Sequence, residues 1–321
     1  MSGSITIAYI LLTTSNNIAG ISCCVYSVGV CFTKIAHMLN QPIVYLNGSF
    51  VDKNKAFVSV MDRGFLFGDG VYEVFPSYNK HIFGLDLHLA RLQKGLKSIQ
   101  IQNPYSLSEW RSIIHKVIEL NPGDNNQAVY LQITRGCDRD RKHTYGDISP
   151  TVYVQSTGFD TRSKQELLKG AEVIIQDDIR WSQCNTKVTS LLPNIMYAQM
   201  AKNLEIEEVI LCRDGVVTEC SSSNVFIVKN ERLYTHPKGS YILPGITREA
   251  VLDCASVCDI PVVEKEFSKN DLLEADEVWV TSSTREVVPI TSVDGIKIGA
   301  GVVGEIWSLI YERYQVIKVK Q

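Results

Sequence analysis

Lys187 is the first residue whose surroundings suggest chemistry, because it is the only charged side chain between Arg180 and Lys202. A lysine among neutral residues can lose its proton, since burial disfavours the ammonium form, and only the neutral amine attacks a carbonyl carbon to form a Schiff base. The alternative is an ordinary lysine whose stem lies on the surface while its ammonium group reaches water. Taken by itself, the position favours this second interpretation.

Glu219 is a second candidate, at the end of an expected strand that starts after the Asp214-Gly215 turn. Cys220 and three serines follow it, and a carboxylate among small polar residues can face a bound cofactor. A solvated glutamate at the end of a strand is the simpler interpretation, and we prefer it for this residue taken singly.

The segment Gly245-Ile246-Thr247 precedes an expected helix. Free backbone N–H groups at a helix N-terminus, together with the Thr247 hydroxyl, suit a phosphate group. Alternatively, Thr247 caps its own helix and binds nothing.

A basic loop is expected at 134–143 (TRGCDRDRKH), where Arg139, Arg141 and His143 lie close together in the sequence. A planar guanidinium group in such a loop can bind a substrate carboxylate through two hydrogen bonds. The alternative is a solvated loop. The glycine-rich segment 299–304 (GAGVVG) matches a dinucleotide-binding pattern, but only 17 residues follow it, so a βαβ unit has no room to form.

The elements that must position these residues are clear from Ile43 onward. Asn47-Gly48 predicts a hairpin between strands at 43–46 and 49–52. Further strands are expected at 71–78 and 128–136, and a helix at 88–99. The apolar periodicity of one face predicts a second helix. This face consists of Trp110, Ile113, Ile114, Val117 and Ile118.

The second half is expected to be rich in strands, with a domain boundary in the polar stretch before it. We assign a small α+β domain to 41–157, a linker to 158–165 and a large domain to 166–321. A helix is expected after Gly245. Strands are predicted at 172–181, 207–212, 216–219, 223–228 and 277–283.

Composition excludes several classes of protein. The net charge of −3 and the absence of a basic stripe argue against nucleic-acid binding. Nine scattered cysteines without CxxC spacing fit reduced thiols in the cytoplasm, and with six dispersed histidines they predict no metal site. Residues 1–40 are apolar but too interrupted to span a membrane and lack an early cationic residue, so we expect an extension outside the fold, with Met38 as a candidate start.

Several ordered motifs resemble those of the fold-type IV (class IV) aminotransferases, and among these the D-amino acid (D-alanine) aminotransferases. The similarity runs from about Ile43 to the C-terminal helix. The motifs are DRGFLFGDGVYEV (62–74), LHLARL (87–92), the RKH loop, DIRWSQCNTK (178–187), VTECSSSNVF (217–226), ILPGITREAV (242–251) and VTSSTRE (280–286). The resemblance implies an α+β fold of two domains, with a small α/β N-terminal domain and a larger β-rich, pseudo-barrel C-terminal domain.

The resemblance also implies pyridoxal 5'-phosphate as the cofactor. Lys187 is similar to the lysine that holds the cofactor and then shuttles the proton. Glu219 is similar to the glutamate that faces the pyridine nitrogen and keeps it protonated. The implied phosphate-binding residues are Arg91, Ile246, Thr247 and Ser283, where Ser283 replaces a common threonine and keeps the hydroxyl.

For the substrate carboxylate, the resemblance implies Tyr72, Arg141 and His143, with the RKH loop reaching in from the partner subunit of a homodimer. The loop is one residue longer than in the close relatives, so Arg139 can take the role given to Arg141. Pro244 stands where lysine is common, which leaves the cofactor assignment unchanged.

The implied activity is a ping-pong exchange of amino groups, in which D-alanine and 2-oxoglutarate give pyruvate and D-glutamate. A branched-chain L-amino acid aminotransferase, or a lyase of the same fold, is the nearest alternative, because stereochemistry depends on how the site holds the substrate. More remote alternatives are a binding protein without turnover and an NAD-dependent dehydrogenase.

Overall fold

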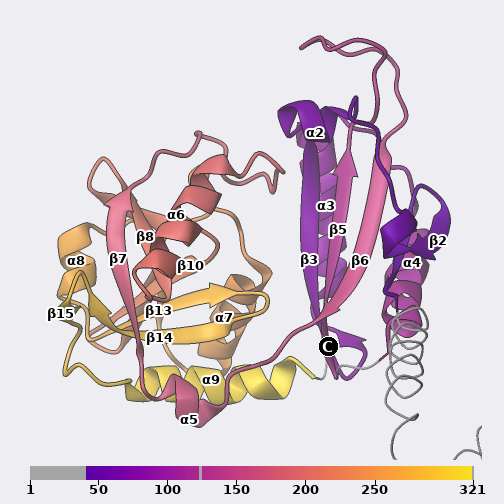
Figure 1. Ribbon diagram of the computed structural model, residues 1–321. Coiled ribbons are helices and arrows are strands. Elements are labelled where there is room, and N and C mark those ends of the chain that lie inside the picture. Colours follow the sequence, from indigo (N-terminus) through magenta and orange to yellow (C-terminus); the bar gives the residue numbers. More distant parts are fainter. Residues whose placement is uncertain (1–40, 123–124, 320–321) are drawn as a thin grey trace, which may run out of the picture. The chain divides into compact units, whose positions relative to one another are not determined.

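The computed structural model describes residues 41–122 and 125–319, so the apolar extension expected at 1–40 lies outside the described residues. From Ile43 onward the chain forms one compact unit. This unit contains two sheets, each with its own hydrophobic core (Figure 1).

The first sheet is antiparallel and, within the described residues, has six strands in the order β2-β1-β6-β5-β3-β4. The predicted hairpin at Asn47-Gly48 is present, and both residues have the positive φ angles that its tight turn requires. The strands span Ile43–Leu46 (β1), Ser49–Asp52 (β2), Gly70–Tyr78 (β3), His81–Ile82 (β4), Asn126–Thr134 (β5) and Thr151–Gly158 (β6).

Two helices, Leu85–Ser98 (α3) and Leu107–Leu120 (α4), pack against this sheet. A capping box between Ser106 and Glu109 starts α4, because each residue satisfies a backbone N–H of the other. The five apolar residues predicted for its inner face are all buried. A short helix, Arg63–Phe67 (α2), precedes β3 at one end of the sheet (Figure 1).

The second sheet is mixed and has nine strands within the described residues, in the order β12-β11-β10-β13-β14-β7-β8-β9, with β15 beside β14. Contacts between β9 and β10 bring distant positions of this order together, so the sheet curls. Its strands span Ala171–Asp177 (β7), Glu208–Arg213 (β8), Val216–Cys220 (β9), Asn224–Lys229 (β10), Arg232–Thr235 (β11), Val262–Glu264 (β12), Glu277–Ser282 (β13), Glu286–Val293 (β14) and Ile296–Lys297 (β15).

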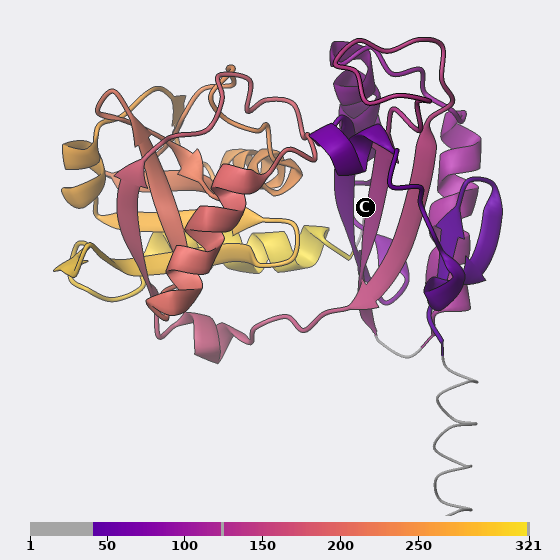
Figure 2. The same ribbon diagram turned by 45° about the horizontal axis from the view of Figure 1, so that its top comes forward.

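Helices surround the second sheet (Figures 1 and 2). Two of them, α7 and α9, pack on each other, α7 also contacts β13, and α6 packs on β8. The helices span Lys164–Leu167 (α5), Leu192–Asn203 (α6), Ile246–Val257 (α7), Lys269–Leu273 (α8) and Glu305–Ile317 (α9). Both halves of the chain therefore combine helices with a sheet, which confirms the predicted α+β class.

Candidate active site

A cavity of about 320 Å³ is lined by residues from both halves of the chain. The first half supplies residues of β3 and α3. The second half supplies the loop before α6, the β9–β10 turn, the N-terminus of α7 and the end of β13. Seven of the residues singled out from the sequence line this one cavity, namely Tyr72, Arg91, Lys187, Glu219, Ile246, Thr247 and Ser283.

Lys187 lies in a loop that is held against β3. The backbone N–H of Tyr72 donates to the Lys187 carbonyl over 3.0 Å, and the next residue, Val188, forms a β-bridge with Val71. The Lys187 side chain is half-buried, and its Nζ lies 4.2 Å from the centre of the Tyr72 ring. The lysine thus faces the cavity rather than the open surface.

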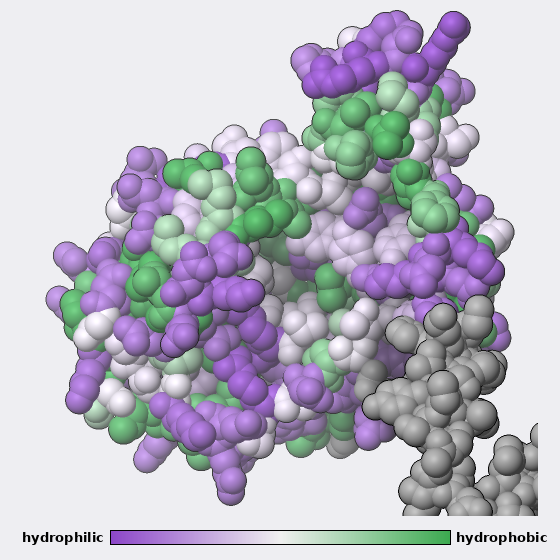
Figure 3. All heavy atoms as spheres, in the orientation of Figure 1, coloured by the Kyte–Doolittle hydropathy of each residue, from purple (hydrophilic) through white to green (hydrophobic). Residues whose placement is uncertain are grey.

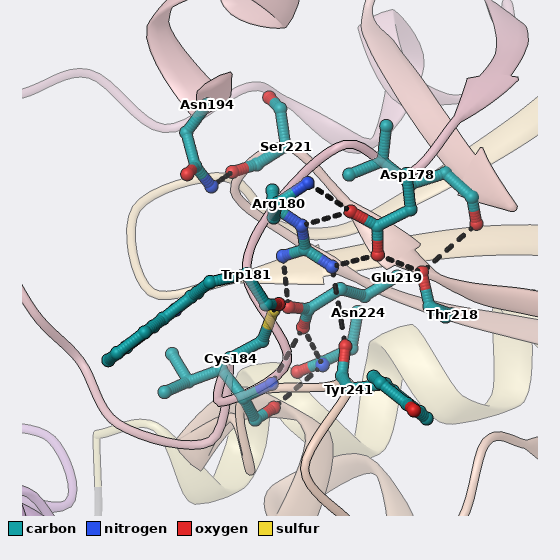
Figure 4. Close-up of polar contacts among 12 residues, drawn as sticks. Asp178, Arg180, Trp181, Cys184, Asn194, Thr218, Glu219, Ser221, Asn224 and Tyr241 are labelled. Carbon is teal, nitrogen blue, oxygen red and sulfur yellow. Dashed lines mark hydrogen bonds and ion pairs between the residues drawn. The ribbon is translucent and has the colours of Figure 1, made fainter. Parts of the chain in front are cut away.

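Glu219 is 5% exposed and lies in the cavity wall, at the end of β9. It accepts hydrogen bonds from Arg180 Nη1 at 2.5 Å, from Asn224 Nδ2 at 3.0 Å and from the backbone N–H of Leu243 at 2.9 Å (Figure 4). These partners come from three separate segments. A solvated strand-end glutamate, the simpler interpretation of the sequence, does not describe this side chain.

Burial raises the pKa of Glu219 to about 7, although the neighbouring Arg180 guanidinium acts to lower it. Burial makes the charged form of this carboxylate costly, so a further positive charge or N–H donor beside it would stabilise that form. Since Glu219 faces the cavity, a protonated ring nitrogen bound there is a suitable partner for it.

Arg180 and Asp178 are parts of the site that sequence reasoning missed. Arg180 donates to both carboxylate oxygens of Asp178 at 2.9 Å while it contacts Glu219 (Figure 4). Thr218 also donates to Asp178, at 3.1 Å. Both missed residues lie inside a motif that carried the resemblance, 178–187, and their place in that motif was the available signal.

Gly245 allows a close approach beside Glu219. A Cβ atom at this position would lie 2.2 Å from Asn224 Oδ1, which is far inside van der Waals contact. Asn224 is 5% exposed, and its Nδ2 donates both to Glu219 and to the Leu243 carbonyl. Any side chain at position 245 would therefore displace the asparagine that holds the carboxylate.

The N-terminus of α7 opens into the cavity without a side-chain cap. Gly245 is the N-cap residue, and it has no side chain that could accept a hydrogen bond from the first turn. Thr247 is buried and lines the cavity, so the alternative that it caps its own helix is wrong. Unsatisfied N–H groups and the positive end of the helix dipole favour an anion here.

Arg91 approaches the same helix end from α3. Its Nη1 donates to the Pro244 carbonyl over 2.9 Å, so the unusual proline takes part through its backbone. The guanidinium also binds both carboxylate oxygens of buried Glu73, at 2.7 and 2.8 Å. His88 Nδ1 is 2.8 Å from the same carboxylate. Burial acts to raise the pKa of Glu73, but Arg91 outweighs it and holds the pKa well below its usual value.

Arg141 and His143 are exposed and do not line the cavity of their own chain. Both lie against α2: the Arg141 Cζ is 4.9 Å from the centre of the Phe67 ring, and the His143 ring centre is 5.6 Å from it. Arg139, the alternative carboxylate ligand, is exposed in the same loop. One chain therefore brings together the residues expected around a cofactor, but not this part of the expected substrate site.

Two structural features are absent from residues 41–122 and 125–319. No helix in these ranges is both long and apolar enough to cross a membrane. The same ranges contain no group of three His, Cys, Asp or Glu residues placed to hold a metal ion.

Known proteins resemble this chain in sequence and in structure. A D-alanine aminotransferase of Bacillus licheniformis is 41% identical over 81% of this chain and 92% of its own length. A branched-chain amino acid aminotransferase of Escherichia coli superposes with a TM-score of 0.79 at 25% identity, over 87% of this chain and 94% of its own. A second branched-chain amino acid aminotransferase, from T.th. and solved with pyridoxamine 5'-phosphate, gives a TM-score of 0.78 at 23% identity, over 88% and 95%.

The family model described as amino-transferase class IV matches residues 70–293, a range that includes each of the seven cavity-lining residues singled out from the sequence. The match covers most of the chain, and the fold agrees with that of solved class IV enzymes. The resemblance predicted from the motifs is confirmed, and this chain is an enzyme that belongs to the class IV aminotransferase family.

Proposed function

We propose that this enzyme is a pyridoxal 5'-phosphate-dependent D-amino acid aminotransferase that converts D-alanine and 2-oxoglutarate to pyruvate and D-glutamate. The observation that carries the proposal is one cavity whose wall contains both Lys187 and Glu219. The similarity to D-alanine aminotransferases, at 41% identity in one case, supports the choice of substrate.

The residues around the cavity fit the cofactor by their chemistry. The uncapped N-terminus of α7, the Thr247 and Ser283 hydroxyls and the Arg91 guanidinium supply donors for a phosphate. Glu219, from the other side of the wall, supplies an acceptor for a protonated ring nitrogen. Lys187 supplies the amine that would hold the cofactor covalently.

When bound, pyridoxal phosphate supplies an aldehyde for the amino group and a ring that accepts electrons as the Cα–H bond breaks. Glu219 would favour the protonated ring nitrogen, because its burial makes an added positive partner valuable. Arg180 and Asp178 would hold the carboxylate of Glu219 in place.

Lys187 would move the proton. Freed from the cofactor when the substrate amino group displaces it, the Lys187 amine would remove the proton from the substrate Cα and return a proton at the C4' atom of the cofactor. The Tyr72 ring, 4.2 Å from Nζ, limits where the amine can lie. The loop that carries Lys187 is tied to β3 by the Tyr72 N–H, so the two residues would be positioned together.

Tyr72, Arg141 and His143 would bind the substrate carboxylate, the last two from the partner subunit of a homodimer. The exposure of Arg141 and His143 outside the cavity of their own chain supports a role in another copy of the chain. Apolar side chains also cover parts of the face in Figure 3, as expected for an interface between subunits. Exposed apolar residues also neighbour cavity-lining residues in the sequence: Ile179 and Trp181 flank Arg180, and Leu192, Ile195 and Met196 lie beside Pro193 and Asn194, each of the five between 49% and 69% exposed.

We place the enzyme in the cytoplasm. The cysteines among the described residues are free thiols, and Cys137 is exposed, which suits a reducing compartment. Cell fractionation with antibody detection tests this assignment, and recovery of the chain outside the cytoplasmic fraction would contradict it.

The branched-chain L-aminotransferase alternative has a specific observation in its favour, the fold similarity to the Escherichia coli enzyme. Initial rates with D-alanine and with L-leucine, each with 2-oxoglutarate, separate the two functions. We expect turnover with D-alanine and little with L-leucine. A clear preference for L-leucine would reject the D-specific function while leaving the family assignment intact.

A complementation experiment tests the shared site. The Lys187→Ala and Arg141→Ala variants are each expected to be impaired as homodimers, the first by loss of the amine and the second by loss of the carboxylate ligand. A hybrid dimer of the two contains one site with Lys187 and with Arg141 from the other subunit. Recovered activity at low substrate concentration on mixing supports the shared site, and no recovery despite hybrid formation contradicts it.

A further inference from the structure

Arg63 binds the main chain of the basic loop at three successive residues. Its Nη1 donates to the Lys142 carbonyl at 2.6 Å and to the Thr144 carbonyl at 3.4 Å, and its Nη2 donates to the His143 carbonyl at 2.9 Å. Its Nε donates to Asp69 at 2.8 Å. Arg63 is 4% exposed, so a buried guanidinium group binds the main chain of an exposed loop.

The loop that Arg63 binds connects β5 to β6 and extends beyond the end of the sheet where α2 lies (Figures 1 and 2). Residues 141–147 are all exposed. Tyr145 gives a further attachment, because its ring centre lies 3.6 Å from Arg135 Cζ and 5.4 Å from Arg63 Cζ. Exposed loops with few buried contacts open easily, so the attachments that exist decide where the loop lies.

A second arginine holds Asp69 in place beneath the loop. Arg135 donates to both Asp69 oxygens, at 2.8 and 2.9 Å, and to the carbonyls of Ile99 and Gln100. Burial acts to raise the pKa of Asp69, but hydrogen bonds from Arg135 and Arg63 outweigh it and lower the pKa. Two guanidinium groups thus bind one charged carboxylate. This fixes the orientation of the Arg63 guanidinium, whose Nη1 and Nη2 atoms point toward the loop.

We infer that Arg63 is a positioning residue that fixes the main chain at 142–144 and thereby presents the Arg141 and His143 side chains for substrate binding. The inference rests on the proposed function, which assigns the carboxylate to this loop. Arg63 itself does not line the cavity. It acts through the loop, since it binds carbonyls and leaves the side chains of the loop exposed.

An arginine suits this task better than a lysine. Its planar fork reaches three carbonyls and one carboxylate at once, whereas a lysine ammonium is a compact group on a flexible stem. The Arg63→Lys variant therefore keeps a positive charge near Asp69 but loses most of the carbonyl contacts. Arg63→Gln removes the charge as well, and Arg135 still neutralises Asp69 in that variant.

Limited trypsin digestion measures the attachment without reference to activity. The loop contains cleavage sites at Arg139, Arg141 and Lys142, so release from Arg63 exposes them further. We expect cleavage there to be about tenfold faster in Arg63→Gln, with Arg63→Lys intermediate, because opening of the loop becomes more frequent. Arg111→Gln, which alters an exposed arginine paired with Asp86, is the matched control and should leave the rate unchanged.

Kinetics of the cofactor-loaded enzyme then test the consequence. In Arg63→Lys we expect the KM for D-alanine to rise about tenfold while kcat changes by less than about threefold, because small displacements of a substrate ligand weaken binding. The absorbance of the bound cofactor should not change. Circular dichroism checks that each variant is folded. If Arg63→Gln does not fold, the cleavage and kinetic measurements rest on Arg63→Lys.

The outcomes separate the two claims. Wild-type cleavage rates in both Arg63 variants would overturn the inference whatever the activity shows. Faster cleavage with an unchanged KM would overturn the positioning role. If the Arg141→Ala and Arg139→Ala variants also leave KM unchanged, the proposed carboxylate site fails as well; if either raises KM, only the inference about Arg63 fails.

Discussion

Arg180 and Glu219 form an ion pair inside the cavity wall, with 2.5 Å between Nη1 and Oε1, and yet burial leaves the pKa of Glu219 near 7. The arginine also binds Asp178 with two other nitrogens, so its charge is shared between two carboxylates. Glu219 is therefore only partly compensated in the protein alone, and this has consequences for stability and for cofactor binding.

The stability of the cofactor-free enzyme should fall as the pH rises from about 4.5 to about 7 through the titration of Glu219. The folded state holds the proton more tightly than the unfolded state, so protonation stabilises the fold at low pH and this contribution is lost above the folded pKa. The shift in the pKa of Glu219 corresponds to a change on the order of 3 kcal/mol in the free energy of unfolding. Urea unfolding at several pH values measures it.

The matched variant for this prediction is Glu219→Gln, which does not titrate and should lack this part of the pH dependence. In the cofactor-loaded wild type, the free energy of unfolding should also depend less steeply on pH, because a protonated ring nitrogen would stabilise the charged carboxylate. Identical pH profiles for the wild type and the glutamine variant, both free of cofactor, would contradict the assignment.

Lys187→Ala should reduce transamination by more than about a thousandfold, because the variant lacks both the covalent attachment and the proton carrier. Borohydride reduction of the wild type, followed by peptide mapping, should place the pyridoxyl group on the peptide that contains Lys187. Lys202→Ala, an exposed lysine at the end of α6, is the control and should keep full activity. Label on another lysine would reject the central assignment.

Gly245→Ala should weaken cofactor binding by about tenfold and destabilise the fold by about 1–3 kcal/mol, because overpacking at a buried site forces neighbours to move. The added Cβ would meet Asn224 Oδ1 at 2.2 Å, and Asn224 holds Glu219. Gly239→Ala is the control, since its nearest neighbour would be 3.9 Å away. Fluorescence titration with pyridoxal phosphate and thermal unfolding give the two quantities, and equal behaviour of both variants would refute the prediction.

Arg141→Ala should raise the KM for D-alanine by about 10- to 100-fold with a smaller effect on kcat, because a hydrogen bond between charged groups contributes about 1.5–3 kcal/mol. Steady-state kinetics with D-alanine as the varied substrate measure this. The extra residue in the loop makes Arg139→Ala the necessary comparison. If Arg139→Ala has the larger effect, Arg139 is the carboxylate ligand.

Periodicity predicted much of the fold because buried faces are regular. The inner face of α4 and the hairpin at Asn47-Gly48 are as expected, since each depends on local spacing or local turn chemistry. The strand expected at 172–181 ends at Asp177, because Asp178 and Arg180 turn their side chains into the cavity wall instead of continuing the ladder. Long-range contacts of this kind leave no periodic signal.

Helix α6 shows why other elements were missed. Its apolar residues Leu192, Ile195 and Met196 are exposed, and only Tyr197 and Ala201 are buried, so the helix has no clear apolar face. Single residues of the site were equally ambiguous, because a lysine, a glutamate and a threonine each have an ordinary structural role. The order of the motifs resolved the ambiguity where the individual residues did not.

The order in which the cavity-lining residues are translated sets the time at which the proposed cofactor could first bind. The cavity wall begins with Tyr72 and is completed only by Ser283, near the end of the chain. Domains fold during translation in the order in which they emerge from the ribosome, so the first sheet can form early while its share of the site stays open. If the cavity holds the proposed pyridoxal phosphate, loading would therefore follow translation of nearly the whole polypeptide, and a chain terminated before Ser283 would lack part of the site.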